Sequence, residues 1–169
     1  PPDIPLKKLP TQYIGFSPEH KGFAGTISLS SNLITSMIKE VGSQLSEMGF
    51  KRLILINGHG GQISLLNTAA RELRSFSPGM AVFPCFLWSG VNGLSELLTK
   101  TEIEDGLHAS LAETSLMLAL KPELVGDERP NEGIKGKIPE GWSLEGNAPT
   151  AWLTDDLSKS GVIGDSRGA

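Results

Sequence analysis

The chain has 169 residues, of which 38% are hydrophobic and 20% are charged, and its formal net charge is −4. This composition predicts one ordinary globular domain rather than a disordered chain. The acidic balance and the scattered Lys and Arg residues exclude the pattern of a nucleic-acid-binding protein. The chain has neither an apolar run long enough to span a membrane nor a signal-like N-terminus, so we expect no membrane partner and a cytoplasmic protein.

The first half of the chain predicts a loop, a helix and a strand in that order. Residues 1–26 are rich in Pro and Gly and have no helical period. Apolar residues then recur at helical spacing over residues 31–48, with Ser30 or Ser31 as N-cap and Gly49 at the position after the C-cap. The following run "RLILIN", residues 52–57, is typical of a strand that is buried on both faces of a parallel sheet.

A second helix and a second strand follow. The helix covers residues 62–75, and its inner face is formed by Ile63, Leu66, Ala70 and Leu73. The strand is the run "MAVFPCFLW", in which Pro84 indicates an edge, a bulge or an early end. The single cysteine, Cys85, lies in this apolar run without a nearby base, so we expect a buried structural thiol rather than a nucleophile.

The second half predicts less regular structure. A short helix is expected at "LSELLTK", residues 94–100, and a third good helix in "ASLAETSLMLALKP", which Pro122 closes. Residues 123–150 predict a long irregular excursion with room for one short hairpin, and no terminal helix is expected. The alternation of helices and strands predicts an α/β fold, an αβα layer sandwich with a mostly parallel sheet.

The loop "NGHGG" places His59 just beyond the carboxyl end of the first strand, where open α/β sheets bind ligands. Its glycines can adopt positive φ and allow a ligand to approach the backbone, and imidazole is a common metal ligand. The loop also opens a helix, whose N-terminus favours an anion. A plain strand-to-helix turn with His59 in solvent is an equal alternative, and a phosphate-binding loop is a weaker one because the motif has no Lys.

A second group of candidate residues lies in "EDGLHASLAETS", which contains Asp105, His108 and Glu113. Carboxylates and imidazoles are the ligands of Zn, Mn and Fe, and a further histidine beside them is a typical proton shuttle. His108 and Glu113 are five positions apart, so a bend near Ser110 is needed for their side chains to converge. The alternative is a capping box, with Ser110 as N-cap and Glu113 accepting its backbone N–H.

Four segments, "GFSPEHKGFAGTISL", "GFKRLILINGHGG", "HASLAETS" and "GVIGDSRGA", together resemble the creatininase (creatinine amidohydrolase) family. The resemblance spans nearly the whole chain. It implies an αβα sandwich, usually assembled as a homohexamer. It also implies hydrolysis of a C–N bond in cyclic amides, formamides or peptides at a centre of one or two divalent metals, Zn, Mn or Fe.

The resemblance also implies roles for single residues. His59 resembles the metal-ligand histidine, Glu113 the glutamate that acts as metal ligand or base, and His108 the proton-shuttling histidine. Substrate contacts are expected at Ser17, Gly60, Trp88 and Asp105. Trp88 is as readily explained as a core or rim residue, and the role of His20 stays open.

The chain departs from the family pattern in several places. Gly61 stands where creatininase has a glutamate, Glu104 where it has a tryptophan, and Ser110 where a glycine is usual. The change at Glu104 makes creatinine a poor candidate substrate. The family's upstream metal-ligand segment does not precede "PPDIPL", so we expect residues 1–169 to form a single creatininase-like domain without the N-terminal strand and those ligands.

The leading interpretation is therefore a metal-dependent amidohydrolase that uses metal-activated water on a small amide or a peptide. The alternative is a non-catalytic oligomeric scaffold, a remnant that has lost the metal centre.

Overall fold

The structure is a computed structural model, and it describes residues 5–132, 138–144 and 148–169. Its contacts divide the chain into two compact units, which are described one at a time. The first contains Pro1–Ser17 and Ile27–Cys85, and the second contains Pro18–Thr26 and Phe86–Ala169. The expected single domain stays a prediction.

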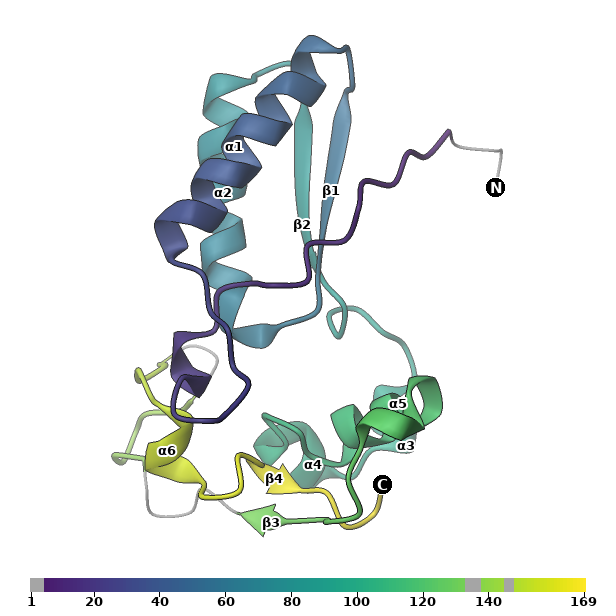
Figure 1. Ribbon diagram of the computed structural model, residues 1–169, viewed down its shortest axis with the longest axis vertical. Helices are drawn as coiled ribbons and strands as arrows, with labels where there is room; N and C mark the ends of the chain where they lie inside the picture. Colours follow the sequence, from purple (N-terminus) through teal and green to yellow (C-terminus); the bar gives the residue numbers. More distant parts are fainter. Residues whose placement is uncertain (1–4, 133–137, 145–147) are drawn as a thin grey trace. The chain divides into compact units, whose positions relative to one another are not determined.

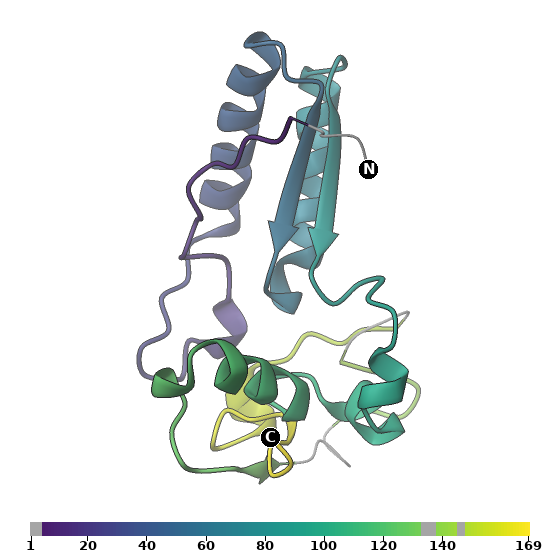
Figure 2. The ribbon, with the colours of Figure 1, turned by 90° about the vertical axis from the view of Figure 1, so that its right-hand side faces the viewer.

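The first unit is built on a strand–helix–strand element. Strand β1 (Arg52–Asn57) is followed by helix α2 (Ile63–Phe76) and strand β2 (Ala81–Phe86), and the two strands pair in one sheet. They run in the same direction, as a helical crossover requires (Figure 1). Helix α1 (Ser31–Glu47) lies beside α2, and both helices cover the same face of the sheet (Figure 2). The predicted α/β fold with a parallel sheet is confirmed.

Local capping explains where α1 begins and ends. The Ser30 hydroxyl accepts the backbone N–H of Leu33 at 3.3 Å, and Gly49 has φ +93° directly after the C-cap, as predicted. Helices α1 and α2 approach closely at Gly42, where a Cβ atom would lie 2.2 Å from Leu73 Cδ2. The buried apolar core of this unit comprises Ile34, Leu66, Ala69, Ala70, Leu73 and Met80. The predicted inner face of α2 is thus buried at Leu66, Ala70 and Leu73, and Ile63 is half-buried.

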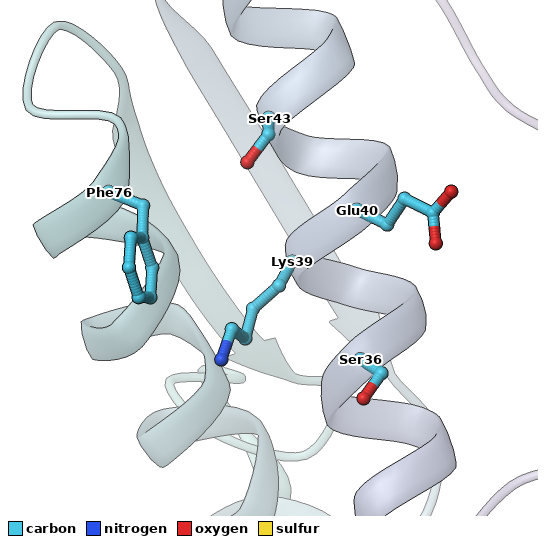
Figure 3. Close-up of a pocket in the computed structure, with 5 residues that line it drawn as sticks. All are labelled: Ser36, Lys39, Glu40, Ser43 and Phe76. Carbon is cyan, nitrogen blue, oxygen red and sulfur yellow. The ribbon is translucent and has the colours of Figure 1, made fainter.

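A polar contact also joins the two helices at their surface. Lys39 Nζ lies 2.8 Å from Glu72 Oε2 and 5.0 Å from the centroid of the Phe76 ring. Together with Ser36, Glu40 and Ser43, Lys39 and Phe76 line a shallow hollow on α1 and α2 (Figure 3). Because both charged groups are about a third or more exposed, this pair contributes on the order of 1 kcal/mol or less to stability.

The prediction that β1 is buried on both faces is wrong for the described residues. Along β1, Leu53 and Leu55 are half-buried, whereas Ile54 and Ile56 are 53% and 71% exposed. In β2, Phe83 is 47% exposed and Cys85 is exposed, so the expected buried thiol is wrong too. The physical reason is that α1 and α2 cover one face of this two-stranded sheet, and side chains that alternate along a strand point to opposite faces.

The second unit consists of short elements. In chain order they are η1 (Pro18–His20), α3 (Leu94–Leu97), α4 (Lys100–Asp105), α5 (Leu111–Leu120), η3 (Pro122–Leu124), β3 (Asn131–Glu132), α6 (Thr154–Leu157) and β4 (Gly164–Asp165). The predicted short helix is confirmed as α3 and the third helix as α5, while α4 was not predicted. The core of the unit is formed by Leu144, Leu157 and Ile163, against which Leu107, Ile138 and Trp152 pack.

Long-range pairing organises this unit. Strand β3, which lies in the predicted irregular excursion, pairs antiparallel with β4, with Asn131 opposite Asp165 and Glu132 opposite Gly164. Residues 133–137 and 145–147 of that excursion lie outside the described part of the chain. His108 forms an isolated antiparallel bridge with Ile163 just before β4. Among the described helices of both units, none is long and apolar enough to cross a membrane.

Candidate functional site

Asn57 shapes the histidine loop of the first unit. It is the last residue of β1 and is only 2% exposed. Its Oδ1 accepts the backbone N–H of His59 at 3.0 Å and an Nε2–H of Gln62 at 2.9 Å, and its Nδ2 donates to the His59 carbonyl at 2.9 Å. His59 is half-buried and stands directly before the 3₁₀ turn η2 (Gly60–Gln62), which leads into α2. A buried amide therefore holds the histidine at the carboxyl end of the strand, as the sequence predicts.

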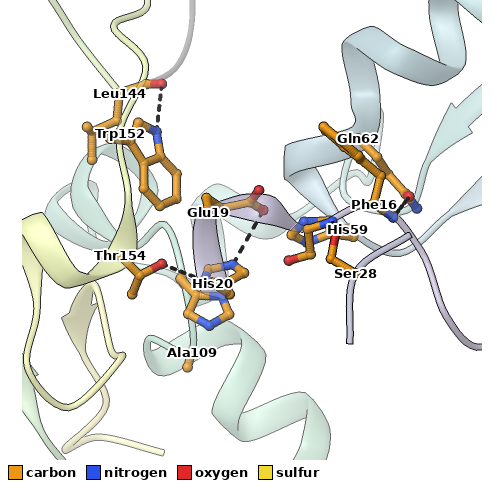
Figure 4. A network of polar contacts seen from close by, with 12 residues as sticks. Phe16, Glu19, His20, Ser28, His59, Gln62, Ala109, Leu144, Trp152 and Thr154 are labelled. Carbon is orange, nitrogen blue, oxygen red and sulfur yellow. Dashed lines mark hydrogen bonds and ion pairs between the residues drawn. The ribbon is translucent and has the colours of Figure 1, made fainter. Parts of the chain in front are cut away.

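The glycines of the histidine loop do not use the positive φ that this residue type allows. Gly58, Gly60 and Gly61 could adopt positive φ, but none of them is among the positive-φ glycines of the described chain. The contact between this loop and residues 15–17 is made by Gln62, whose Oε1 accepts the backbone N–H of Phe16 at 3.1 Å (Figure 4). The neighbouring Ser17 donates its backbone N–H to Ser28 Oγ at 2.8 Å. The "GFS" segment thus lies beside the histidine loop, within the same unit.

In the second unit, the structure brings His108 and Glu113 together. His108 Nδ1 lies 3.9 Å from Glu113 Oε2. The bend that allows this convergence is at Ala109, one residue before the position expected from the sequence, where φ is +49°. A non-glycine residue rarely adopts this left-handed conformation, which costs roughly 1–2 kcal/mol. Directly before the bend, two backbone hydrogen bonds of 3.2 and 2.8 Å join His108 to Ile163.

The capping box, the alternative interpretation of this segment, is wrong. Ser110 stands at the N-cap position of α5, but its side chain makes no capping hydrogen bond. The Glu113 carboxylate does not accept the Ser110 N–H either. It accepts the backbone N–H of Ala109, at 2.7 Å. This contact orients Oε2 of Glu113 toward the imidazole of His108.

His20, whose role the sequence left open, is buried and stacks on His108. The two ring centroids are 4.0 Å apart, with an angle of 26° between the rings. His20 Nδ1 lies 2.5 Å from Thr154 Oγ1, and its Nε2 lies 3.6 Å from Glu19 Oε1 (Figure 4). Thr154 is fully buried, and no sequence pattern pointed to it. The second unit therefore gathers two imidazoles and two carboxylates from two chain segments, and the Thr154 hydroxyl from a third.

For the remaining predicted site residues the structure gives a position but no role. Asp105 is the last residue of α4, three positions before His108, and is half-buried. Trp88 is half-buried in the turn after β2. Substrate contact by these two residues and by Ser17 and Gly60 stays a prediction. So do the role of His59 as metal ligand and that of Glu113 as ligand or base.

Comparison with known proteins settles the family. The family model described as creatinine amidohydrolase, Creatininase, matches residues 2–169. The chain belongs to the creatininase family. A similar curated relative is a mycofactocin precursor peptide peptidase of Mycobacterium tuberculosis, 31% identical over 96% of this chain and 59% of its own length. A creatinine amidohydrolase of Pseudomonas putida is 32% identical over 63% of this chain and 45% of its own length.

Solved structures support the same family fold. A creatininase described as a Mn form superimposes with a TM-score of 0.65, at 24% identity, over 92% of this chain and 63% of that one. A mutant creatininase of Zn-Zn type gives 0.63 at 25% identity, over 87% of this chain and 58% of that one. This chain spans about three fifths of the length of the mycofactocin precursor peptide peptidase that it matches.

Proposed function

We propose that this chain carries the proton-transfer residues of a metal-dependent amidohydrolase that cleaves a C–N amide bond of a peptide. The observation that carries the proposal is the convergence of His108 and Glu113 at the bend of Ala109. A carboxylate and an imidazole within 4 Å of one another can pass a proton between them, and catalytic hydrogen bonds often tighten only when substrate binds.

The donor chemistry of the chain fits a divalent metal. Imidazole nitrogens and carboxylate oxygens are the ligands of Zn, Mn and Fe. His59, at the carboxyl end of β1, and Glu113 are the proposed ligands, and the Mn and Zn-Zn forms among the similar structures favour these metals. When bound, such a metal polarises a carbonyl and lowers the pKa of a water molecule.

The residues of the second unit then have distinct tasks in the proposed reaction. Glu113 Oε2 accepts the proton that the attacking water loses. His108, next to it, delivers a proton to the departing nitrogen, so that the amine leaves as a neutral group. The ring of His20, stacked at 4.0 Å, limits the orientations that the imidazole of His108 can adopt. Asp105 and Ser17 orient the substrate, and Gly60 and Trp88 contact it.

A peptide is the proposed substrate rather than creatinine. The relatives described as mycofactocin precursor peptide peptidases match 73–96% of this chain, whereas the creatinine amidohydrolase matches 63%. Glu104 also replaces the tryptophan that creatininase has beside its substrate-holding acid. A carboxylate is a poor partner for a flat heterocycle and a good one for a peptide's N–H groups or positive charge. A cytoplasmic homo-oligomer is part of the same proposal.

Elemental analysis and peptide hydrolysis by the purified protein and three variants test the proposal. His59→Ala and Glu113→Ala should lose bound metal while keeping the native far-ultraviolet circular dichroism. His108→Ala should retain the metal and lose about 10²- to 10⁴-fold in kcat. Glu123→Gln, an exposed carboxylate on η3, is the matched control and should change neither quantity. A folded wild-type protein with no metal and no hydrolysis of any peptide would favour the non-catalytic scaffold instead.

A further inference from the structure

A buried carboxylate lies between helices α4 and α5 of the second unit. Glu102, on α4, is 7% exposed and both of its oxygens accept hydrogen bonds. Oε2 accepts the hydroxyl of Ser110 at 2.6 Å, and Oε1 accepts the backbone N–H of Ala112 at 2.9 Å. Buried glutamates are rare unless they are paired in this way. No sequence pattern pointed to a role for Glu102, and the proposed reaction does not use it directly.

The surrounding backbone is shaped to accommodate this carboxylate and its serine partner. A Cβ atom on Gly106 would lie 2.4 Å from Glu102 Cδ, and one on Gly164 would lie 2.3 Å from Ser110 Oγ. Gly164 also has φ +129°, which disfavours other residues. Ser110 Oγ in turn accepts the backbone N–H of Asp165 on β4 at 3.0 Å. The two glycines thus leave the space that the Glu102 carboxylate and the Ser110 hydroxyl occupy.

The Glu102 contacts replace the cap that α5 would otherwise have. Ala112 donates one of the N–H groups that a helix N-terminus leaves without an intrahelical partner, and an N-cap side chain usually accepts one of them. Here the Glu102 carboxylate accepts the Ala112 N–H. The negative charge of this carboxylate is also stabilising next to the N-terminus of a helix. The Ser110 side chain does not cap α5 and instead bonds to Glu102 on α4 and to Asp165 on β4. The start of α5, with His108 on one side and Glu113 on the other, is therefore held by two neighbouring elements.

We propose that Glu102 is the positioning residue of the His108–Glu113 pair: through Ser110 and Ala112 it fixes the left-handed bend at Ala109 that brings the imidazole and the carboxylate together. This inference rests on the proposed function in one respect, because the reaction is assumed to use that pair. The geometric part, the dependence of the Ala109 bend on Glu102, is independent of any activity.

The test compares Glu102→Leu, Glu102→Gln and a control, Glu96→Leu, which makes the same change at an exposed position of α3. In Glu102→Leu, amide hydrogen exchange at Ala109, which reports its bond to Glu113, should accelerate about tenfold or more. The kcat for a peptide amide should fall about 10²-fold with a change in KM below about threefold, since small misplacements of catalytic groups have effects of this size. Glu96→Leu should match the wild type in all three quantities.

Glu102→Gln should retain most of the wild-type behaviour, within about threefold in kcat, because its amide oxygen can still accept the Ala112 N–H and its NH₂ group can donate to Ser110 Oγ. If Glu102→Leu fails to fold, Ser110→Ala takes its place: it removes one of the two hydrogen bonds and should give a smaller loss of the same kind. A wild-type rate of Ala109 exchange in folded Glu102→Leu, or in Ser110→Ala where it takes the place of Glu102→Leu, would overturn the inference. So would a lowered melting temperature with unchanged kcat, which is the signature of a merely structural role.

Failure of the proposed function has a different signature. A wild-type protein without amide hydrolysis would refute the proposed function, while the Ala109 exchange rates would still decide whether Glu102 holds the bend.

Discussion

The hydrogen bond between Thr154 and His20 allows a sharp test of the geometry in the second unit. Thr154→Val replaces a hydroxyl with a methyl group of nearly the same volume at a fully buried position. The change removes the contact of 2.5 Å to His20 Nδ1 and leaves that nitrogen without this partner in a buried site. Removing one partner of a buried hydrogen bond costs about 1–3 kcal/mol. We expect the free energy of unfolding to fall by this amount.

Urea unfolding followed by tryptophan fluorescence measures the effect, because Trp88, Trp142 and Trp152 all belong to the second unit. With a slope of roughly 2 kcal/mol per molar urea, the midpoint should fall by about 0.5–1.5 M. The control is Thr68→Val on α2, where an exposed hydroxyl donates to the Ser64 carbonyl at 3.0 Å. Its effect should stay within about 0.5 kcal/mol.

Nuclear magnetic resonance of the imidazole nitrogens gives a second readout of the same change. The Nδ1 signal of His20 should shift in Thr154→Val, and the ring protons of His108 should shift with it because the two rings are stacked. An unfolding midpoint equal to that of the control, together with unchanged imidazole signals, would refute the role given to Thr154.

Two further predictions concern stability. Gly42→Ala should lower the free energy of unfolding by up to about 2 kcal/mol, because the cost of overpacking against Leu73, about 1–3 kcal/mol, exceeds the gain of about 1 kcal/mol in helix propensity. In a Leu73→Ala background the same change should raise the free energy of unfolding. An equal loss in both backgrounds would contradict the close packing of Gly42 against Leu73. The backbone N–H of Lys159, together with contacts from Ser160, lowers the pKa of Glu132 from 4.5 to about 2. Because the folded value lies below the unfolded one, this contribution to stability is complete above about pH 4.5 and is lost as the pH falls toward 2. Glu132→Gln should therefore flatten the pH dependence of unfolding in that window, and an unchanged slope there would contradict the contact.

The elements that were predicted correctly depend on neighbours in the chain. Helix α1 begins after Ser30 and ends before Gly49 because a hydroxyl cap and a left-handed glycine act within a few residues of the helix ends. Strand β1 ends at Asn57, whose side chain bonds to residues two and five positions later within the loop. Such contacts leave a pattern in the sequence that propensity and periodicity can detect.

The burial of the strands could not be predicted in the same way. An apolar run shows that its residues tolerate burial, but the run does not specify which layer covers them. Ile56 and Cys85 were therefore expected in a core, and both are exposed in the described structure.

The candidate site depends on contacts between distant residues, and here local motifs misled. Ser110 and Glu113 have the spacing of a capping box, yet the Ser110 hydroxyl bonds to Glu102 on another helix. Glu102 itself has the sequence signature of an ordinary surface acid on a short helix. The one available signal was Gly106, four residues later, where a helix would place a neighbour of Glu102. Thr154 bonds to a histidine 134 positions away, and no local pattern could reveal it.

The bridge between His108 and the segment around Ile163 also determines when this part of the protein can form. Asp165, which bonds to Ser110, leaves the ribosome 55 residues after it. Closing a loop of that length costs about 3.5 kcal/mol of chain entropy, before any contact compensates for it. While the chain is still being synthesised, the bend at Ala109 therefore lacks the strand that holds it. The contacts of His108 and Ser110 with residues 163–165 consequently form only after the chain has been translated through that segment.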